Sequence, residues 1–500
     1  MSSKPTTVAE LLNAIELGSP VAEFDAALSR YFVETSTFQK LVDDGGDIVS
    51  GDKGAGKTAL FRILKDNFGT YDALGDVEVI SAFNPQGTPA FQQLTEQEVL
   101  SEGSYISVWK SYLFMLAGNW LLDLYGSARP GSLVRLDDLL QNSGLRAGSA
   151  KPASAFQRVI SFIRPKQAEV TGTVTPDGIP IFTTKISLAD NAPPKEVPVD
   201  VVRYDEALSL LDDCLDETGV TLWLVFDRLD EAFQASPEVE KPALRALLRS
   251  YLDIQSLAHL QIKLFLRNDL FARISEGGFV NLTHINARKI PITWEDDDLY
   301  TLLYRRLRES KQLLEGLGLP QDAGAQELFD AVFPSKVDEG SKRPTTWNWI
   351  LTRIRDGNDV KSPRNLVDLV IKAIDAQKRR EAQDPRSWVE GDPLLTGDSL
   401  KRALTELSRE RVTDTLLAEA GDAAAHVKRF EGGKAEQNAA SLQSLFGKES
   451  TEVTKRLVTL GFLEKTGQSY KVPMLYRQGL DITQGKAWAI GEAAADDDES

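Results

Sequence analysis

The sequence is poor in the residues that build disulfides and zinc sites. Its one cysteine, Cys214, has no second cysteine with which to form an intrachain disulfide. The three histidines, His259, His284 and His426, are scattered and do not form a zinc site of the usual ligand spacing. We therefore expect a protein of the reducing cytoplasm in which Cys214 is a buried small residue.

Long apolar runs and basic stretches are also scarce. The most apolar segment, residues 112–124, contains Asn119 and Asp123 and is too short to span a bilayer, which favours a buried helix. The first seven residues lack a basic segment followed by an apolar run, so we expect no secretion signal and no membrane association. The formal net charge of −17 argues against a surface coated in nucleic acid, although a local basic patch stays open.

The remaining composition is that of a globular protein of several domains, with 42% hydrophobic and 26% charged residues in 500. We predict an N-terminal helical segment over 1–40 and an α/β core over 41–295, with an insertion at about 84–200 that includes a hairpin at 169–185. A helical region over 296–383 and a C-terminal domain over 384–500 with an acidic tail complete the prediction.

The core is predicted to be a parallel sheet. Apolar and β-branched segments at 77–83, 220–226 and 261–266 have the composition of strands, and a shorter one at 288–294 contains Pro291, which suggests an edge position. Helical patterns separate them. Alternating strands and helices indicate an α/β fold.

The most specific motif is Gly51-x-x-x-x-Gly56-Lys57-Thr58, which follows the short apolar run Ile48-Val49 and opens a helix. Glycines allow a tight turn whose N–H groups point at phosphate oxygens, Lys57 bridges the β- and γ-phosphates, and the Thr58 hydroxyl binds magnesium. A nucleotide with Mg²⁺ is therefore the expected ligand. The predicted binding residues are Gly51, Asp52, Lys53, Gly54, Ala55, Gly56, Lys57, Thr58 and Ala59.

A second group of polar residues follows the buried strand at 220–226. Asp227 is predicted to hold the magnesium through water, and Asp230 and Glu231 to orient the water that attacks the γ-phosphate. The alternative is that these acids cap the next helix. Pairing with an intact phosphate loop favours the functional interpretation.

Two further positions are weaker candidates for phosphate contacts. Arg267 and Asn268 end the strand at 261–266, where a generic turn is the alternative. Arg364 opens an amphipathic helix from which it reaches a phosphate, or else it is a solvated residue of the first turn.

These four elements in this order resemble the AAA+ and STAND-type P-loop ATPases, including the origin-recognition ATPases, over residues 40–380. The resemblance implies ATP as the nucleotide, Gly51 to Thr58 as Walker A, Asp227 to Glu231 as Walker B, Arg267 or Asn268 as sensor 1, and Arg364 as sensor 2. Arg228 occupies the position where typical AAA+ proteins carry the catalytic glutamate, so slow hydrolysis is expected. The family also implies a homo-oligomer and an arginine acting in trans, for which the candidates are Arg245, Arg249, Arg273 and Arg288.

The C-terminal segment 441–473 has the pattern of helix, turn, helix and hairpin, and it resembles a winged helix. Its predicted exposed helix face carries Thr451, Lys455 and Arg456, which are suited to DNA contact. Interleaved glutamates weaken that patch. Both a protein-contact role and a DNA-binding role stay open.

Three functions follow from these motifs. The first is a magnesium-dependent ATPase acting as a conformational or assembly switch, and the second is a nucleotide-gated scaffold with little hydrolysis. The third is a DNA-binding initiator or regulator. Similar ATPases occur in bacterial anti-phage defence, so that role is expected from resemblance alone, together with a partner effector because no effector motif is visible.

Overall fold

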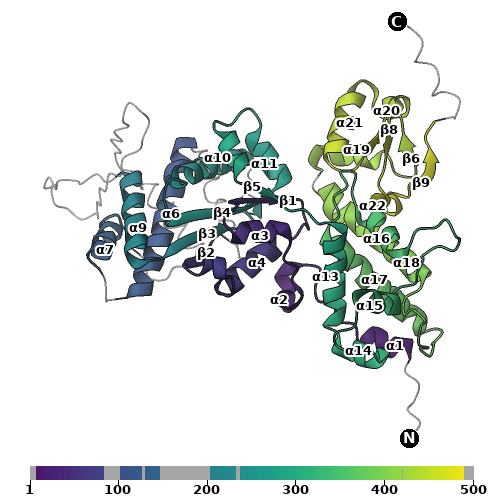
Figure 1. The fold of residues 1–500 in the computed structure, drawn as a ribbon. Coiled ribbons are helices and arrows are strands. Elements are labelled where there is room, and N and C mark those ends of the chain that lie inside the picture. The colour runs from purple at the N-terminus through teal and green to yellow at the C-terminus, as the bar shows by residue number, and fades with distance from the viewer. Residues whose placement is uncertain are drawn as a thin grey trace, which may run out of the picture. The chain divides into compact units, whose positions relative to one another are not determined.

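The computed structural model describes residues 7–83, 102–126, 130–146, 203–231, 237–418 and 420–488. The chain forms two compact units, whose elements are labelled in Figure 1. Unit 1 comprises Met1–Thr35, Gly54–Gly56 and Trp294–Ser500, and unit 2 comprises Ser36–Lys53 and Lys57–Thr293. The hairpin predicted at 169–185 lies outside the described residues, as does most of the insertion predicted at 84–200.

Unit 2 is built around a five-stranded parallel sheet in the order β2-β3-β4-β1-β5. The strands are β1 (Ile48–Gly51), β2 (Val77–Phe83), β3 (Thr221–Phe226), β4 (Leu260–Arg267) and β5 (Lys289–Pro291). The predicted strands are confirmed. The strand that contains Pro291 lies at an edge, where the missing N–H of proline breaks no ladder.

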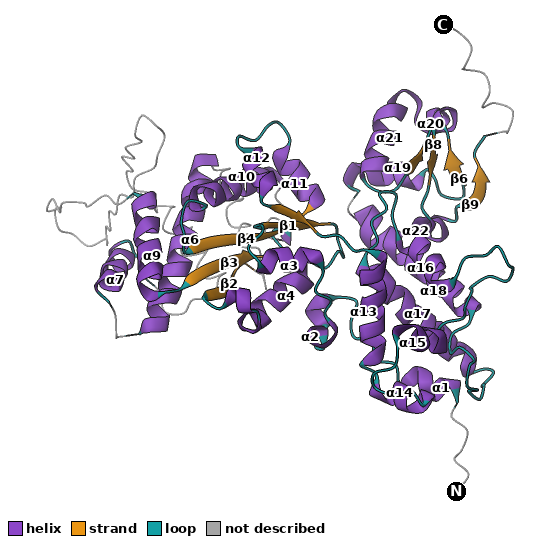
Figure 2. Cartoon of the chain, in the orientation of Figure 1, coloured by secondary structure: helices purple, strands orange, loops and turns teal. Residues whose placement is uncertain are grey.

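Helices cover both faces of this sheet (Figure 2). The helices of unit 2 are α3 (Ser36–Val42), α4 (Lys57–Asn67), α6 (Glu102–Tyr125), α7 (Gly131–Asn142), α9 (Tyr204–Thr218), α10 (Pro237–Ile254), α11 (Asn268–Ser275) and α12 (Leu282–Ala287), of which α7 packs against α6 and α9. On one face Phe61 of α4 packs edge-on against Phe265, with ring centroids 6.1 Å apart. On the other, Trp109 of α6 packs against Phe226 at 5.9 Å. Successive strand residues point to opposite faces, so both faces of the sheet are apolar and buried.

Helix α6 includes the most apolar segment of the sequence and is a buried helix, as predicted. The amide of Asn119 donates to the backbone oxygens of Met115 (2.7 Å) and Leu145 (2.9 Å), which satisfies a polar group inside the core. Among the helices that the structure describes, none is both long enough and apolar enough to cross a membrane. Cys214 of α9 is buried, also as predicted.

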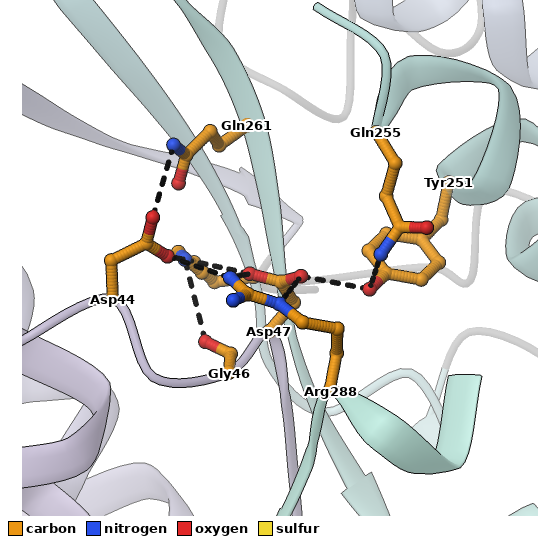
Figure 3. Close-up of polar contacts among 8 residues, drawn as sticks. Asp44, Gly46, Asp47, Tyr251, Gln255, Gln261 and Arg288 are labelled. Carbon is orange, nitrogen blue, oxygen red and sulfur yellow. Dashed lines mark hydrogen bonds and ion pairs between the residues drawn. The ribbon is translucent and has the colours of Figure 1, made fainter. Parts of the chain in front are cut away.

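A partly buried network of charges joins the amino-terminal ends of β1 and β5 to the middle of β4 (Figure 3). Lys263 of β4 has no exposed side-chain surface, and its ammonium group donates to Asp44 (2.5 Å) and Asp47 (2.7 Å). Arg288, which precedes β5, donates to Asp47 from Nε (2.8 Å) and from a terminal nitrogen (2.9 Å). The hydroxyl of Tyr251 also donates to Asp47, at 2.8 Å. One carboxylate therefore ties together β1, β4, α10 and the residue that leads into β5.

The partners of Asp47 keep it ionised. Burial acts to raise the pKa of Asp47, but the hydrogen bonds from Arg288 and the charge of Lys263 outweigh it and lower that pKa to about 2. A carboxyl group whose folded pKa is depressed contributes stability above its unfolded pKa of about 4. That contribution is lost as the pH falls from about 4 through about 2.

Unit 1 is mainly helical, in agreement with the helical pattern predicted after Asp296. Its longer helices are α1 (Val8–Asn13), α13 (Asp296–Arg308), α14 (Lys311–Leu317), α15 (Ala325–Val332), α16 (Thr346–Ile354), α17 (Pro363–Glu381) and α18 (Gly397–Glu410). Four-residue α2 (Leu28–Tyr31) lies in the N-terminal part. One hydrophobic core runs through these helices and on into the C-terminal segment.

The C-terminal segment of unit 1 has the predicted helix–turn–helix–hairpin order. After α19 (Ala424–Lys428) and β6 (Lys434–Gln437) come α20 (Ala439–Phe446), α21 (Ser450–Thr459), β7 (Glu464–Thr466), β8 (Ser469–Lys471), α22 (Met474–Arg477) and β9 (Thr483–Lys486). The four strands form a sheet in the order β7-β8-β6-β9. On α21, Val453 and Leu457 are buried, whereas Thr451, Lys455 and Arg456 are exposed, as predicted.

The charge network predicts the effect of removing Asp47. Asp47→Ala leaves the fully buried Lys263 with Asp44 as its remaining carboxylate partner, so unit 2 should lose about 3–5 kcal/mol of unfolding free energy. Urea unfolding followed by circular dichroism measures this loss. Asp43→Ala, an exposed neighbour, is the control and should change stability by less than about 0.5 kcal/mol. A loss below about 1 kcal/mol for Asp47→Ala would contradict the structural role of the network.

Candidate nucleotide site

The predicted strand, loop and helix are present around Gly51 to Thr58. Strand β1 ends at Gly51 and α4 begins at Lys57. In the loop between them Gly54 has φ +80° and Gly56 has φ +102°, a region that side chains rarely adopt. The backbone therefore favours glycine at positions 54 and 56. The loop opens at the first turn of α4, where the free N–H groups and the helix dipole favour an anion.

Lys57 is folded back over its own loop. Its ammonium group donates to the backbone oxygens of Gly51 and Asp52, both at 2.9 Å. Burial lowers the pKa of Lys57, and the charge of Arg267 lowers it further, whereas Asp227, Asp230 and Asp52 act to raise it. Two of the three carboxylates predicted at the end of β3, Asp227 and Asp230, therefore act on Lys57.

Asp227 and its neighbours follow the carboxyl end of β3. Asp227 is only 1% exposed. Arg228 has φ +59°, which turns the chain sharply after the strand, and its Nε donates to the Glu231 carboxylate at 2.5 Å. Glu231, one of the predicted water-orienting acids, is therefore ion-paired with Arg228.

The two predicted sensor 1 residues both lie beside the loop. Arg267 is the register partner of Gly51 in the β1–β4 ladder. Its guanidinium binds Asp269 at 2.9 and 3.1 Å and Asp230 at 3.4 Å. The side-chain amide of Asn268 donates to the Asp52 carboxylate at 3.0 Å. Arg267 therefore contacts the acidic strand end, and Asn268 contacts the loop.

Arg364 lies in the first turn of α17, within unit 1. The loop residues Gly54–Gly56 belong to the same unit. Ser362 donates from Oγ to the backbone oxygen of Gly54 at 2.9 Å, and a Cβ placed on Gly54 would lie 3.2 Å from that of Arg364. The predicted sensor 2 helix therefore begins beside Gly54–Gly56, which form the tip of the phosphate loop.

Two contacts of the loop tip have no signal in the sequence. Besides Ser362, the indole N–H of Trp294 donates to the backbone oxygen of Ala55 at 2.8 Å. Both partners bind backbone oxygens from more than 200 residues away, so no local pattern marks them.

The side chains near the loop fit a magnesium ion that travels with a nucleotide. Magnesium takes oxygen ligands and is held by one or two protein groups together with phosphates and water. Thr58, in the first turn of α4, would offer a hydroxyl, and Asp227, directly after β3, would offer a carboxylate. Within the described ranges, no cluster of three or more His, Cys, Asp or Glu side chains could hold a metal ion.

Comparisons with known proteins add a set of distant structural likenesses. No family model and no curated protein matches the chain. The Walker-type ATPase PABY2304 of Pyrococcus abyssi is similar at 14% identity and a TM-score of 0.40, covering 90% of this chain and 96% of that chain. The ORC1 protein of Aeropyrum pernix in complex with DNA is similar at 12% identity and a TM-score of 0.33, covering 93% and 95% respectively. The ORC2 protein of Aeropyrum pernix, in ADPNP–ADP complexes, is similar at 15% identity and a TM-score of 0.34, covering 94% and 96%.

These TM-scores all lie below 0.5, so the assignment rests on the geometry of this chain. A parallel sheet with helices on both faces carries a glycine-rich loop between β1 and α4, and an acidic strand end lies beside its lysine. The chain has the α/β fold of a P-loop nucleoside triphosphatase.

Proposed function

We propose that this chain is an ATP-binding, magnesium-dependent ATPase that uses nucleotide as a conformational or assembly switch. The observation that carries the proposal is the position of Lys57, whose ammonium group lies on the loop carbonyls and close to Asp227 and Asp230. ATP phosphates would replace those carbonyls as partners of Lys57, and Asp227 with Thr58 would hold the magnesium that neutralises charge on the phosphates.

The scaffold with little hydrolysis is the second candidate, and the Arg228–Glu231 ion pair favours it. The guanidinium of Arg228 occupies the Glu231 carboxylate that would otherwise orient the attacking water, so turnover would be slow. Sustained multiple-turnover phosphate release distinguishes the ATPase from the scaffold.

The loop geometry predicts that Lys57→Ala and Thr58→Ala abolish ATP turnover. Lys57→Ala removes the cation that pairs with the β- and γ-phosphates, and Thr58→Ala removes the magnesium hydroxyl. Phosphate release under saturating ATP and magnesium, together with titration of a fluorescent ATP analogue, measures both effects. Lys65→Ala is the control, because Lys65 lies on the same helix with a half-exposed side chain. Unchanged ATPase activity in either loop variant would contradict the proposal.

In an oligomer, an arginine from a neighbouring copy would complete the ATPase site. The four candidate arginines differ in the contacts that they make within unit 2. Arg288 is held by Asp44 and Asp47. Arg245 donates to two backbone oxygens, and Arg249 binds Glu102. Arg273 has a side chain 51% exposed and pairs with Glu240 at 3.2 Å. These contacts favour Arg273 as the residue that reaches a neighbouring copy.

The assembly proposal predicts a larger particle when ATP and magnesium are added. Light scattering of the full chain with and without nucleotide measures the mass. Arg273→Ala should retain ATP binding but lose at least about tenfold in turnover, because the cation that stabilises the transferring phosphoryl group is missing. A chain that stays monomeric under all nucleotide conditions would contradict an assembly switch.

The C-terminal helix α21 is proposed as a winged-helix recognition element that contacts a protein partner. Thr451, Lys455 and Arg456 are exposed there, but Glu449 and Glu452 are exposed beside them. Mixed charge suits a protein surface better than a phosphate backbone.

Because of this mixed charge, we expect the full chain not to bind duplex DNA at physiological ionic strength, about 0.15 M. A mobility-shift titration over a salt series makes the measurement. Salt-dependent binding that is lost in a Lys455→Glu, Arg456→Glu variant would instead establish DNA recognition through α21.

A role in bacterial anti-phage defence, in the cytoplasm and with a partner effector, is proposed from family resemblance alone. The genes that neighbour this one test it. Neighbours that consistently lack nuclease, protease or other effector domains would count against the role.

A further inference from the structure

We propose that Asp52, the second residue of the phosphate loop, is the carboxylate that orients the water attacking the γ-phosphate. This inference rests on the proposed ATPase function and deepens it. It assigns Asp52 a role in the reaction, whereas the sequence pattern placed it among residues that bind through their backbone.

The position of Asp52 is defined by two contacts in unit 2. Its backbone oxygen accepts a hydrogen bond from the ammonium group of Lys57 at 2.9 Å. Its carboxylate accepts one from the side-chain amide of Asn268 at 3.0 Å. Lys57 marks where the β- and γ-phosphates bind, and Asn268 is the first residue of α11, directly after β4. The Asp52 carboxylate is therefore directed from the phosphate loop toward the end of the neighbouring strand.

The other carboxylates near Lys57 are engaged differently. Glu231 is paired with the guanidinium of Arg228, and Asp230 with that of Arg267. Asp227 occupies the buried position suited to magnesium. The carboxylates of Glu231 and Asp230 therefore already have a charged guanidinium partner. Asn268 is a neutral donor, which orients Asp52 without cancelling its charge.

The step that Asp52 assists is the in-line attack of water on the γ-phosphorus. The water oxygen forms a bond to phosphorus while the bond from phosphorus to the β–γ bridging oxygen breaks, leaving its electron pair on ADP. Asp52 accepts a hydrogen bond from the water and takes the proton that the water loses, then returns it to the inorganic phosphate or to solvent. A positioned base of this kind contributes about 10²–10⁴-fold to a rate.

The proposal predicts a separation between catalysis and binding. Asp52→Asn keeps the size of the side chain and a hydrogen-bonding partner for Asn268, but it removes the base. The rate of a single turnover should fall about 10²-fold or more. ATP affinity should not weaken, because the substitution also removes a negative charge beside the phosphates.

Asn268 provides a second, independent readout. Asn268→Ala leaves Asp52 without the amide that orients it, so the single-turnover rate should also fall. The double variant should be no slower than Asp52→Asn by more than about twofold, because residues that act as one unit are not additive. Residues in contact couple whatever their role, so the affinity of each variant for the ATP analogue separates a catalytic contribution from a structural one.

The experiment uses the full chain with ATP and magnesium, measuring single-turnover phosphate release and the dissociation constant of a fluorescent ATP analogue. Asp66→Asn is the matched control, because Asp66 is 51% exposed on α4. A slow Asp52→Asn variant with undiminished affinity and non-additive coupling to Asn268 supports the proposal.

Three outcomes overturn the proposal. In the first, Asp52→Asn turns over within twofold of the native rate while Lys57→Ala is inactive, which leaves the ATPase function standing. In the second, Asp52→Asn loses affinity in parallel with rate, which makes Asp52 a structural loop residue. In the third, the native chain shows no turnover at all, which removes the ATPase function together with this inference.

Discussion

The buried ion network around Asp47 is the constraint on which the arrangement of unit 2 depends. Asp47 directly precedes β1, and its backbone N–H and C=O pair with Arg288 and Leu264 while its carboxylate binds Lys263 and Arg288. Strand β1 is only four residues long, so few ladder hydrogen bonds hold it between β4 and β5. Charged hydrogen bonds in a low-dielectric interior compensate, because they are costly to break once formed. They fix one end of the strand whose other end opens into the phosphate loop.

The register of β1 against β4 then brings the chemistry together. Gly51 is opposite Arg267, so the loop begins where β4 ends, and Asn268 of the next helix reaches Asp52. Strand β3 pairs with β4 on its other side and delivers Asp227 to the same edge. Parallel strands place all their carboxyl ends at one edge of a sheet, which is why polar residues from three distant segments meet there. At that edge, Arg228 pairs with Glu231 and Arg267 pairs with Asp230. The neutral side-chain amide of Asn268 donates to Asp52.

Much of this could be predicted from local patterns. The strands at 77–83, 220–226 and 261–266, the edge strand with Pro291 and the loop glycines follow from hydrophobicity, β-branching and backbone freedom, which are properties of short segments. The partners of individual acids could not be predicted. Nothing in Asp227-Arg-Leu-Asp-Glu231 indicates that Arg228 turns toward Glu231, since this depends on a left-handed backbone at Arg228. The contacts of Trp294 and Ser362 with the loop tip likewise depend on chain segments separated by hundreds of residues.

The sequence by itself determined the phosphate loop, the parallel α/β class and the helix–turn–helix–hairpin order of the C-terminal segment. Each of these depends on interactions among residues close in the chain, whose spacing is visible in the sequence. Only the tertiary structure decided which carboxylate has which partner, that Arg273 is the most exposed of the four arginines, and that Lys263 is buried against Asp47. Those outcomes depend on register and on side-chain direction across strands. Burial strengthens each such pairing, but the spacing of residues along the chain does not predict it.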